Sequence, residues 1–352
     1  MSNTDVNAPR WRRGLTGHYE VWGTSFNHRP SRTGGVIHYG LHSPKAGHGQ
    51  PSCSLAFSFF DAIQGGNNLA LLQRFDVQRL ALQDAPLRIA IDAGELTADR
   101  IRGNLPQTKK TPAVRWDLNY RSSSFPHLPL PEFGYHSALV ASKSLTPNPA
   151  IYLSGTVAVG ERELQLDQSP GGQYHAWGNA RRSAWTRVHC CAFREEPTAA
   201  LELYSVRTNL GPLRTPPLTF VALYLGGEVY RFRDITQAAL IRADWAPNSI
   251  RFIATGRTIR LEGEIAARTE QLIAADEQAP NGRTVSRQLT QIASAKVLLH
   301  SRRSPIAPFR EVCRLSCANA VHFERGGAPT PDPPSTRQRI ISDAAQTAES
   351  AD

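Results

Sequence analysis

Short β-type segments separated by turn residues run along most of this chain and limit what it can fold into. Residues 156–159 alternate apolar and polar positions, a glycine-first pair follows, and residues 162–166 alternate again. A two-residue loop that begins with glycine suits a type II′ turn, so we expect an antiparallel hairpin here. Residues 218–225 are nearly all apolar and precede two glycines, which predicts a second hairpin with a buried first strand.

Glycine and proline make long helices improbable in this sequence. The chain holds 26 Gly and 25 Pro spread over 352 residues. Many short strands joined by such turns are typical of β-sandwiches and barrels. Because a domain contains roughly 100–200 residues, the length indicates two domains. We therefore predict an all-β protein with few helices.

Proline-rich segments mark the predicted domain boundaries. One surrounds Pro197, and another begins after Gly326 and runs into a polar end. We predict an N-terminal domain over residues 10–196 and a C-terminal domain over 197–327. Residues 328–352 are predicted to be a disordered tail, because their composition cannot supply a core.

The composition excludes disordered and membrane proteins. Apolar residues make up 40% of the chain and charged residues 20%, and the mean hydropathy is −0.36. No apolar run approaches the roughly 18–20 residues that span a bilayer, and the first ten residues lack the apolar core of a secretory signal. We expect a cytoplasmic protein.

The five cysteines, an odd number with one adjacent pair, argue against a disulfide framework and against structural zinc.

The net charge of +10 gives little information about function. The basic residues are mostly arginines scattered along the chain, whereas nucleic-acid-binding proteins concentrate them on one face. No helix-turn-helix, zinc-finger or RNA-recognition signature is present. We interpret the arginines as solvated side chains on sheet surfaces, expect no nucleic-acid partner, and leave the oligomeric state open.

The first stretch that could carry chemistry is residues 17–27. On a strand, Glu20, Trp22 and Phe26 share one face. If that face lines a cavity, burial should raise the pKa of Glu20 and make it a proton donor. The alternative is a partly exposed glutamate beside core aromatic residues.

A second candidate is Asp117, which lies between apolar residues in the segment 116–120. Aspartate is depleted in strand interiors, so a catalytic role is one interpretation. The other is that its carboxylate accepts hydrogen bonds from backbone N–H groups at a strand edge.

The densest stretch is residues 171–193, where glycines flank a strand rich in His, Trp and Arg. Trp177 and Trp185 offer flat faces for a planar or cationic group, and His175 can donate or accept a proton near neutral pH. Arg182 (or its neighbour Arg181) can hold a carboxylate or enolate oxygen. Residues 185, 187, 189 and 191 should share one face of a strand. An aromatic core with arginines extending to solvent is the alternative interpretation.

Common catalytic signatures are missing from the sequence. There is no phosphate-binding P-loop, no dinucleotide-binding glycine fingerprint, no nucleophile elbow and no His-Glu-x-x-His. No pair of histidines has a convincing spacing for a metal site. We therefore predict neither a cofactor nor a metal ion.

Together these stretches resemble a known family. The order Tyr-Glu-Val-Trp with Phe-Asn near the start, Trp-Asp-Leu in the middle, and Gly-Gly-Gln-x-His-x-Trp-Gly with a following Arg and Trp is similar to the tocopherol cyclase-like and hydroxyneurosporene synthase-like superfamily. That superfamily contains AttH-type proteins and Diels–Alder cyclases. The resemblance covers roughly residues 14–325. The chain departs from the family pattern at Gly23, where a larger residue is common, and at Thr186 and Arg187, where apolar or aromatic residues are expected.

The resemblance implies two lipocalin-like antiparallel β-barrel domains packed side by side, with a hydrophobic pocket at or between them. Members cyclise prenylated quinols, hydrate carotenoid double bonds or close polyketide-derived rings. The implied catalytic residues are Glu20, Asp117 and His175, and the implied substrate-binding residues are Trp22, Asn27, Trp177, Arg182 and Trp185.

These observations predict a cofactor-independent cyclase, isomerase or hydratase of secondary metabolism. Its substrate would be a hydrophobic polyene, a prenylated compound or a polyketide-type metabolite that the pocket folds into a reactive conformation. An acidic side chain would supply the proton. The alternative is a non-catalytic carrier of lipid or pigment, because concave apolar sites serve both roles.

Overall fold

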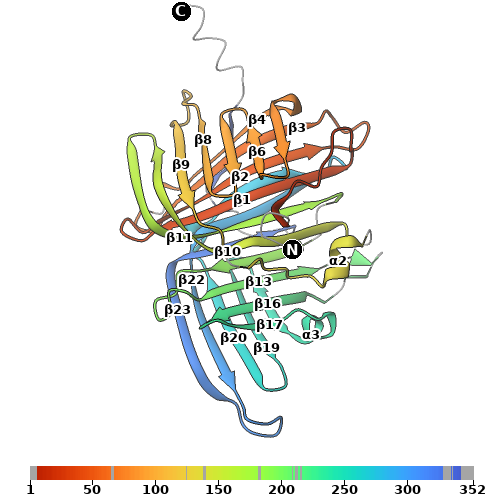
Figure 1. The fold of residues 1–352 in the computed structure, drawn as a ribbon, viewed down its shortest axis with the longest axis vertical. Coiled ribbons are helices and arrows are strands. Elements are labelled where there is room, and N and C mark those ends of the chain that lie inside the picture. The colour runs from red at the N-terminus through yellow and green to blue at the C-terminus, as the bar shows by residue number, and fades with distance from the viewer. Residues whose placement is uncertain are drawn as a thin grey trace, which may run out of the picture.

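The chain is described by a computed structural model at residues 6–64, 67–123, 125–137, 140–180, 184–207, 209–210, 213–214, 216–327, 334 and 336–341. In this part of the chain nearly all regular structure is β-strand, arranged as two large curled sheets (Figure 1). The predicted all-β class with two lipocalin-like halves is confirmed.

The first sheet lies in the upper half of Figure 1 and contains twelve described strands in the order β25-β4-β3-β2-β1-β11-β10-β9-β8-β7-β6-β5. Their bounds are β1 (His18–His28), β2 (Thr33–Ser43), β3 (Ser52–Asp61), β4 (Leu69–Asp76), β5 (Leu80–Gln83), β6 (Arg88–Ile91), β7 (Gly94–Thr97), β8 (Arg100–Leu105), β9 (Val114–Tyr120), β10 (Ser142–Val159), β11 (Arg162–Gly178) and β25 (Arg339–Ile341).

The second sheet contains eleven described strands, nine of them in the order β17-β16-β13-β12-β23-β22-β20-β19-β18, with β21 pairing with both β22 and β24. Their bounds are β12 (Ala184–Cys190), β13 (Ala200–Arg207), β16 (Leu218–Leu225), β17 (Glu228–Phe232), β18 (Arg242–Ala246), β19 (Ser249–Thr255), β20 (Ile259–Ala266), β21 (Ile273–Gln278), β22 (Thr284–Ser301), β23 (Arg310–Gly326) and β24 (Thr336–Arg337).

The remaining described elements are small. They are the helices α2 (Glu132–His136) and α3 (Ile235–Leu240), the 3-10 turns η2 (Val77–Arg79) and η3 (Thr269–Gln271), and a two-stranded ribbon of β14 (Asn209–Leu210) and β15 (Leu213–Arg214). Within the residues described, the helices are too short and too polar to cross a membrane.

Both hairpins predicted from turn residues are confirmed. β10 pairs with β11 up to Val159 and Arg162, and Gly160 between them has a φ of 60°. β16 pairs with β17 across two glycines that both have positive φ. Glycine adopts this left-handed conformation without a steric penalty, so these turn residues define where the chain reverses.

Apolar side chains form a separate core inside each half and a smaller cluster between the halves. Trp22, Phe57 and Trp116 belong to the first core. The cluster between the sheets includes Phe60 from β3 and Leu289 from β22. Strands β1 and β2 and the part of β11 from Ser169 onward are therefore buried on both faces, because one face lines the first core and the other packs against the second sheet.

The chain changes sheet earlier than the predicted domain boundary. β11 ends the first sheet's part of the chain at Gly178, and β12 is hydrogen-bonded between β13 and β23 of the second sheet. β12 nevertheless lies inside the predicted N-terminal domain of residues 10–196. The prolines near Pro197 mark the loop between β12 and β13, not the passage from one sheet to the other.

The prediction of a disordered tail over residues 328–352 is wrong for residues 336–341. β24 pairs in parallel with β21, and β25 pairs in parallel with β4, so this segment joins an edge of each sheet. Ile341 is buried in the first core. Long-range strand pairing holds a segment whose composition alone predicts disorder. Apart from Pro334, the other tail residues lie outside the described part of the chain.

Truncation after Gly327 should lower the free energy of unfolding by about 2–3 kcal/mol, because burial of one isoleucine side chain contributes about that much. Urea denaturation measures the change. Truncation after Ile341 is the matched control and should leave the free energy of unfolding unchanged. Equal midpoints for the two truncated proteins would contradict a stabilising role for β24 and β25.

Candidate functional site

Pairing of β1 with β11 brings four of the predicted site residues together. Glu20 lies opposite Trp177, and Trp22 lies opposite His175. The His175 ring is 5.1 Å from the Trp22 ring and 4.8 Å from the Trp177 ring, measured between centroids. The predicted sharing of a strand face by Glu20 and Trp22 is thus confirmed, and it extends across the neighbouring strand.

Glu20 is fully buried and its carboxylate is surrounded by donors. Its Oε1 accepts from the backbone N–H of Arg10 at 2.7 Å and lies 2.8 Å from His175 Nε2, while its Oε2 accepts from the Trp11 N–H at 2.8 Å. Burial alone would raise the pKa of Glu20, but hydrogen bonds from His175, His18 and the Arg10 backbone outweigh it and lower the pKa to about 2. The prediction of a raised pKa is wrong, and Glu20 is an ionised structural carboxylate, not a proton donor.

The N-terminal segment covers this group of side chains. His175 Nδ1 is 3.2 Å from the Val6 carbonyl, and Trp22 Nε1 donates to the Asn7 carbonyl at 3.1 Å. Arg10 lies over the Trp177 ring. Trp177 reaches a surface hollow of about 420 Å³, but His175, like Glu20, is fully buried. Through these contacts the group of buried side chains packs the N-terminal segment against the first sheet, and we call it the packed joint.

Three other predicted residues have different positions. Asp117 forms an exposed bidentate ion pair with Arg100, 2.8 and 2.6 Å between heavy atoms, so its predicted catalytic role has no support. Both ends of the buried Asn27 amide bond to Gln291 of β22, so Asn27 connects the sheets. Arg182 lies outside the described residues.

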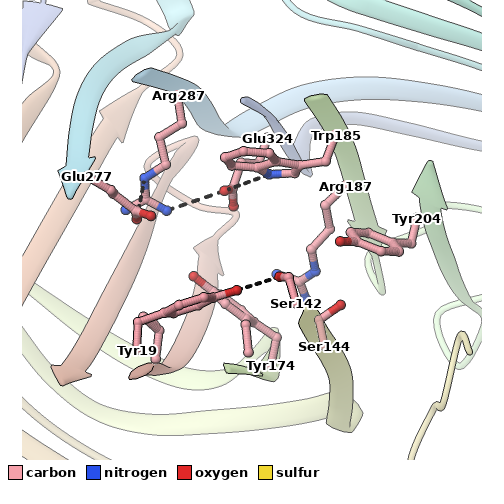
Figure 2. A pocket seen from close by; sticks show the side chains of 12 residues that line it. Tyr19, Ser142, Ser144, Tyr174, Trp185, Arg187, Tyr204, Glu277, Arg287 and Glu324 are labelled. Atoms are coloured by element: carbon pink, nitrogen blue, oxygen red, sulfur yellow. Dashed lines mark hydrogen bonds and ion pairs between the residues drawn. The ribbon is translucent and has the colours of Figure 1, made fainter. Parts of the chain in front are cut away.

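Trp185, the remaining predicted residue, lines a cleft between the two sheets. The cleft consists of a cavity of about 50 Å³ and a larger one of about 280 Å³, which share Val21, Glu277 and Arg287 as walls. Figure 2 shows the smaller cavity, with Tyr19 and Tyr174 from the first sheet facing Trp185, Arg187 and Glu324 from the second. We call this space the inter-sheet cleft. It is more polar than the hydrophobic pocket that the resemblance implies.

A buried ion-pair network forms one wall of the inter-sheet cleft. Arg287 Nε is 3.0 Å from a Glu277 oxygen, and Arg287 Nη1 is 3.4 Å from Glu324 Oε1 (Figure 2). Trp185 Nε1 donates to the same Glu324 oxygen at 3.3 Å. Burial would raise the pKa of Glu324, but the charge of Arg287 and the hydrogen bond from His322 hold it well below its usual range. The wall therefore carries fixed, opposite charges at neutral pH.

Tyr174 and Arg187 form the opposite wall. Arg187 lies 4.0 Å above the centre of the Tyr174 ring, and the Tyr174 hydroxyl is 2.6 Å from His38 Nε2. Burial and then the charge of Glu324 raise the pKa of Tyr174, while burial and the charge of Arg287 hold the pKa of His38 well below its usual value. At neutral pH the phenol is protonated and the imidazole is neutral. Within the described residues Arg187 makes no ion pair.

Two glycines leave room for the aromatic walls. A Cβ atom on Gly23 would overlap the Tyr174 ring, and a Cβ on Gly326 would overlap the Trp185 ring. Each ring therefore lies flat on the backbone of a neighbouring strand. Gly23 stands where a larger residue is common in the family, because here the Tyr174 ring occupies the space that a larger side chain would need.

Glu202 of β13 is a buried carboxyl group of the second sheet. It pairs across the strands with His189, and its Oε1 has no hydrogen-bond partner among the described residues. Burial raises the pKa of Glu202 to about 7, against the opposing effects of the Arg187 charge and a hydrogen bond with Thr146. Such a group changes its charge within the physiological pH range.

Several residues of the inter-sheet cleft are not among the candidates predicted from the sequence, and the sequence contains a signal for only some of them. Tyr174 is adjacent to His175, but alternation along the strand points it to the other sheet. Arg187 and His189 were expected to share a face with Trp185, and that face does lie against the first sheet: Arg187 covers Tyr174 and His189 contacts the Pro149 carbonyl. Arg287 and Glu277 had no recognisable local signal. No group of three metal-binding side chains occurs among the residues described.

Comparison with known proteins shows the fold but not the activity. No family model matches the chain. It is 23% identical over 324 residues to uncharacterized proteins of two Mycobacterium tuberculosis strains, covering 91% of this chain and 84% of theirs. Among solved structures, an AttH-like protein of Nitrosomonas europaea aligns with a TM-score of 0.54 at 12% identity, covering 88% of this chain and 92% of that one.

Two further solved structures have the same fold. Kievitone hydratase of Nectria haematococca aligns with a TM-score of 0.53 at 11% identity, covering 95% of this chain and 92% of that one. CghA aligns with a TM-score of 0.56 at 10% identity over 94% of each chain. The chain therefore has the lipocalin-like fold that these proteins share, as the resemblance in its motifs implied.

Replacement of Glu20 by glutamine should lower the free energy of unfolding by about 3 kcal/mol, because it leaves the buried donors of His175 and the Arg10 and Trp11 backbone without their charged acceptor. Since the folded-state pKa is lowered, this stabilisation is present above the unfolded pKa near 4.5 and is lost as the pH falls toward 2. Urea denaturation at several pH values measures it. Asp117→Asn is the control and should change little, because solvent screens its exposed ion pair.

Glu202 should make the protein less stable as the pH rises from about 4.5 to about 7. Its folded pKa is raised to about 7. Because a shift of one pKa unit corresponds to about 1.4 kcal/mol, ionisation of Glu202 costs about 3 kcal/mol more in the folded than in the unfolded state. The neighbouring His189 acts in the opposite sense up to its unfolded pKa near 6.5, because burial lowers its folded pKa to about 3, so the effect of Glu202 is measured as a difference between two proteins that both contain His189. Glu202→Gln should remove this part of the pH dependence. Parallel stability curves for the two proteins would contradict the assignment.

Proposed function

We propose that the chain is an enzyme that performs acid–base chemistry on a hydrophobic metabolite in the inter-sheet cleft. The reaction class is hydration, isomerisation or ring closure of a polyene, a prenylated compound or a polyketide-type molecule that carries a carbonyl or phenolic oxygen. The proposal keeps the predicted reaction classes and moves the site from Glu20 and His175 to the opposite face of the same strands.

The observation that carries this proposal is the placement of Arg187. Its guanidinium lies over the Tyr174 ring and within the described residues has no carboxylate partner, although it borders the cavity. A guanidinium can donate two parallel hydrogen bonds to a carbonyl, enolate or phenolate oxygen. Negative charge that develops on a substrate oxygen would be stabilised there.

Tyr174 and His38 can supply the proton transfer. The protonated phenol can donate its proton to a substrate oxygen or to an alkene carbon, and the neutral His38, 2.6 Å away, can stabilise the resulting tyrosinate by a hydrogen bond from Nε2. The tyrosinate then takes back a proton that the substrate loses, either from the water that adds to it or from a carbon next to the cationic centre, so the phenol is restored at the end of the reaction. General acid–base groups of this kind must lie within hydrogen-bond distance of each other and of the substrate.

The other walls suit a hydrophobic substrate. Trp185 and Tyr204 present aromatic surface to the smaller cavity, together with Val21 and Ala176. The larger cavity of about 280 Å³ could hold the rest of the molecule. The likeness to kievitone hydratase, a water-adding enzyme by name, supports hydration among these reactions through the shared fold.

Tyr174→Phe should reduce turnover about 10²–10⁴-fold, because it removes the proton donor but keeps the ring that lies on Gly23. The assay incubates the protein with a panel of polyene, prenylated and polyketide-type compounds. Mass spectrometry then detects a product heavier by one water, or one of equal mass with a different retention time.

Arg187→Met should lower kcat/KM in the same assay about tenfold or more, because it removes the guanidinium that would bind the substrate oxygen.

Asp117→Asn is the control for these variants and should keep full turnover, since it lies on the exposed face of β9. Wild-type rates in Tyr174→Phe would refute the acid–base role of the inter-sheet cleft. A panel compound that raises the melting temperature without conversion would instead support the carrier alternative.

A further inference from the structure

A second opening between the sheets lies at the end of β1 that is remote from Tyr19. It is a hollow of about 330 Å³ formed by the β1–β2 turn, the segment after β12 and the middle of β23. Three arginines from two of these segments line it, namely Arg29, Arg32 and Arg194. We call it the arginine hollow. No aspartate or glutamate is among its lining residues.

Two of these arginines have uncompensated charges. In the part of the chain that the structure describes, neither the Arg29 nor the Arg32 side chain makes a hydrogen bond or an ion pair. Arg194 is 3.1 Å from Glu195, but the oxygens of Glu195 also accept from the Ser316 N–H and hydroxyl. Arg29 also borders an adjoining hollow, where Asp167 is the acidic residue. The arginine hollow therefore favours an anion.

The backbone of the turn is strained in a way that positions Arg32. Arg32 has a φ of 54°, a left-handed conformation that costs free energy for a residue with a side chain. The turn is closed by a hydrogen bond from the Arg32 N–H to the Arg29 carbonyl, and His28 Nδ1 bonds to the Ser31 hydroxyl at 2.6 Å. Asn319, across the hollow, has a similar φ of 55°, but asparagine adopts this conformation readily, so the strain lies at Arg32. Strained residues of this kind cluster at binding sites.

We propose that the arginine hollow binds the phosphate group of a small molecule. A carboxylate has two oxygens, which one guanidinium can satisfy, whereas a phosphate offers oxygens on several sides to arginines from separate segments. The volume of about 330 Å³ is that of a small-molecule site. This proposal does not depend on the function proposed for the inter-sheet cleft.

The test is isothermal titration of the full chain with inorganic phosphate and pyrophosphate at low ionic strength. Arg32→Gly is the decisive variant, because glycine adopts the left-handed conformation without strain but lacks the guanidinium. It should raise the melting temperature and weaken phosphate binding at least fivefold. Arg29→Gln should weaken binding to a similar extent. The control Arg115→Gln removes an exposed charge from β9 and should bind like the wild type.

Two outcomes would overturn the proposal. One is that the wild type shows no saturable binding of either anion. The other is that Arg32→Gly and Arg29→Gln bind as tightly as Arg115→Gln, which would show that only the overall positive charge attracts phosphate. A more stable Arg32→Gly protein with unchanged phosphate affinity belongs to the second outcome.

Discussion

The wall that the second sheet presents to the first depends on a buried pair of opposite charges, Arg287 of β22 and Glu324 of β23. Removing two charges from water is costly, and their attraction offsets that cost only where further hydrogen bonds complete the network. Glu277, Trp185 and His322 complete it here. The same pair influences the opposite wall, because the charge of Glu324 helps to raise the pKa of Tyr174 and that of Arg287 helps to lower the pKa of His38. One ion pair of the second sheet thus helps burial to set the protonation of the groups on the first sheet that face it.

The inter-sheet cleft follows from the period of a β-strand. Successive side chains of β1 and β11 point to opposite faces, so Glu20 and His175 pack toward the first half while Tyr19 and Tyr174 face the second sheet. The first group is closed by the N-terminal segment, and the second remains open because Gly23 and Gly326 let large rings lie flat on their neighbours. A polar cavity and a packed joint therefore occupy the two sides of the same pair of strands.

Much of the fold could be predicted from the sequence, and the site only in part. Local signals were sufficient for the hairpins, because the glycines at Gly160 and Gly226 carry the required φ themselves. Alternation also predicted which side chains share a face. It could not show which face borders a cavity, since β1 is buried on both sides. Glu277 and Arg287 meet Tyr174 only through the packing of one sheet on the other, and β25 joins β4 across more than half of the chain, so neither contact leaves a local pattern.

A continuous series of polar contacts connects the two openings between the sheets. Asn27 borders the arginine hollow and bonds to Gln291, whose side-chain oxygen is 3.1 Å from His322 Nδ1. His322 Nε2 lies 3.5 Å from Glu324, which borders the inter-sheet cleft. Both ends of the Asn27 amide and the Gln291 side chain are occupied by these bonds, so each has a single arrangement. The series therefore links the two openings through buried side chains whose hydrogen bonds each fix one orientation.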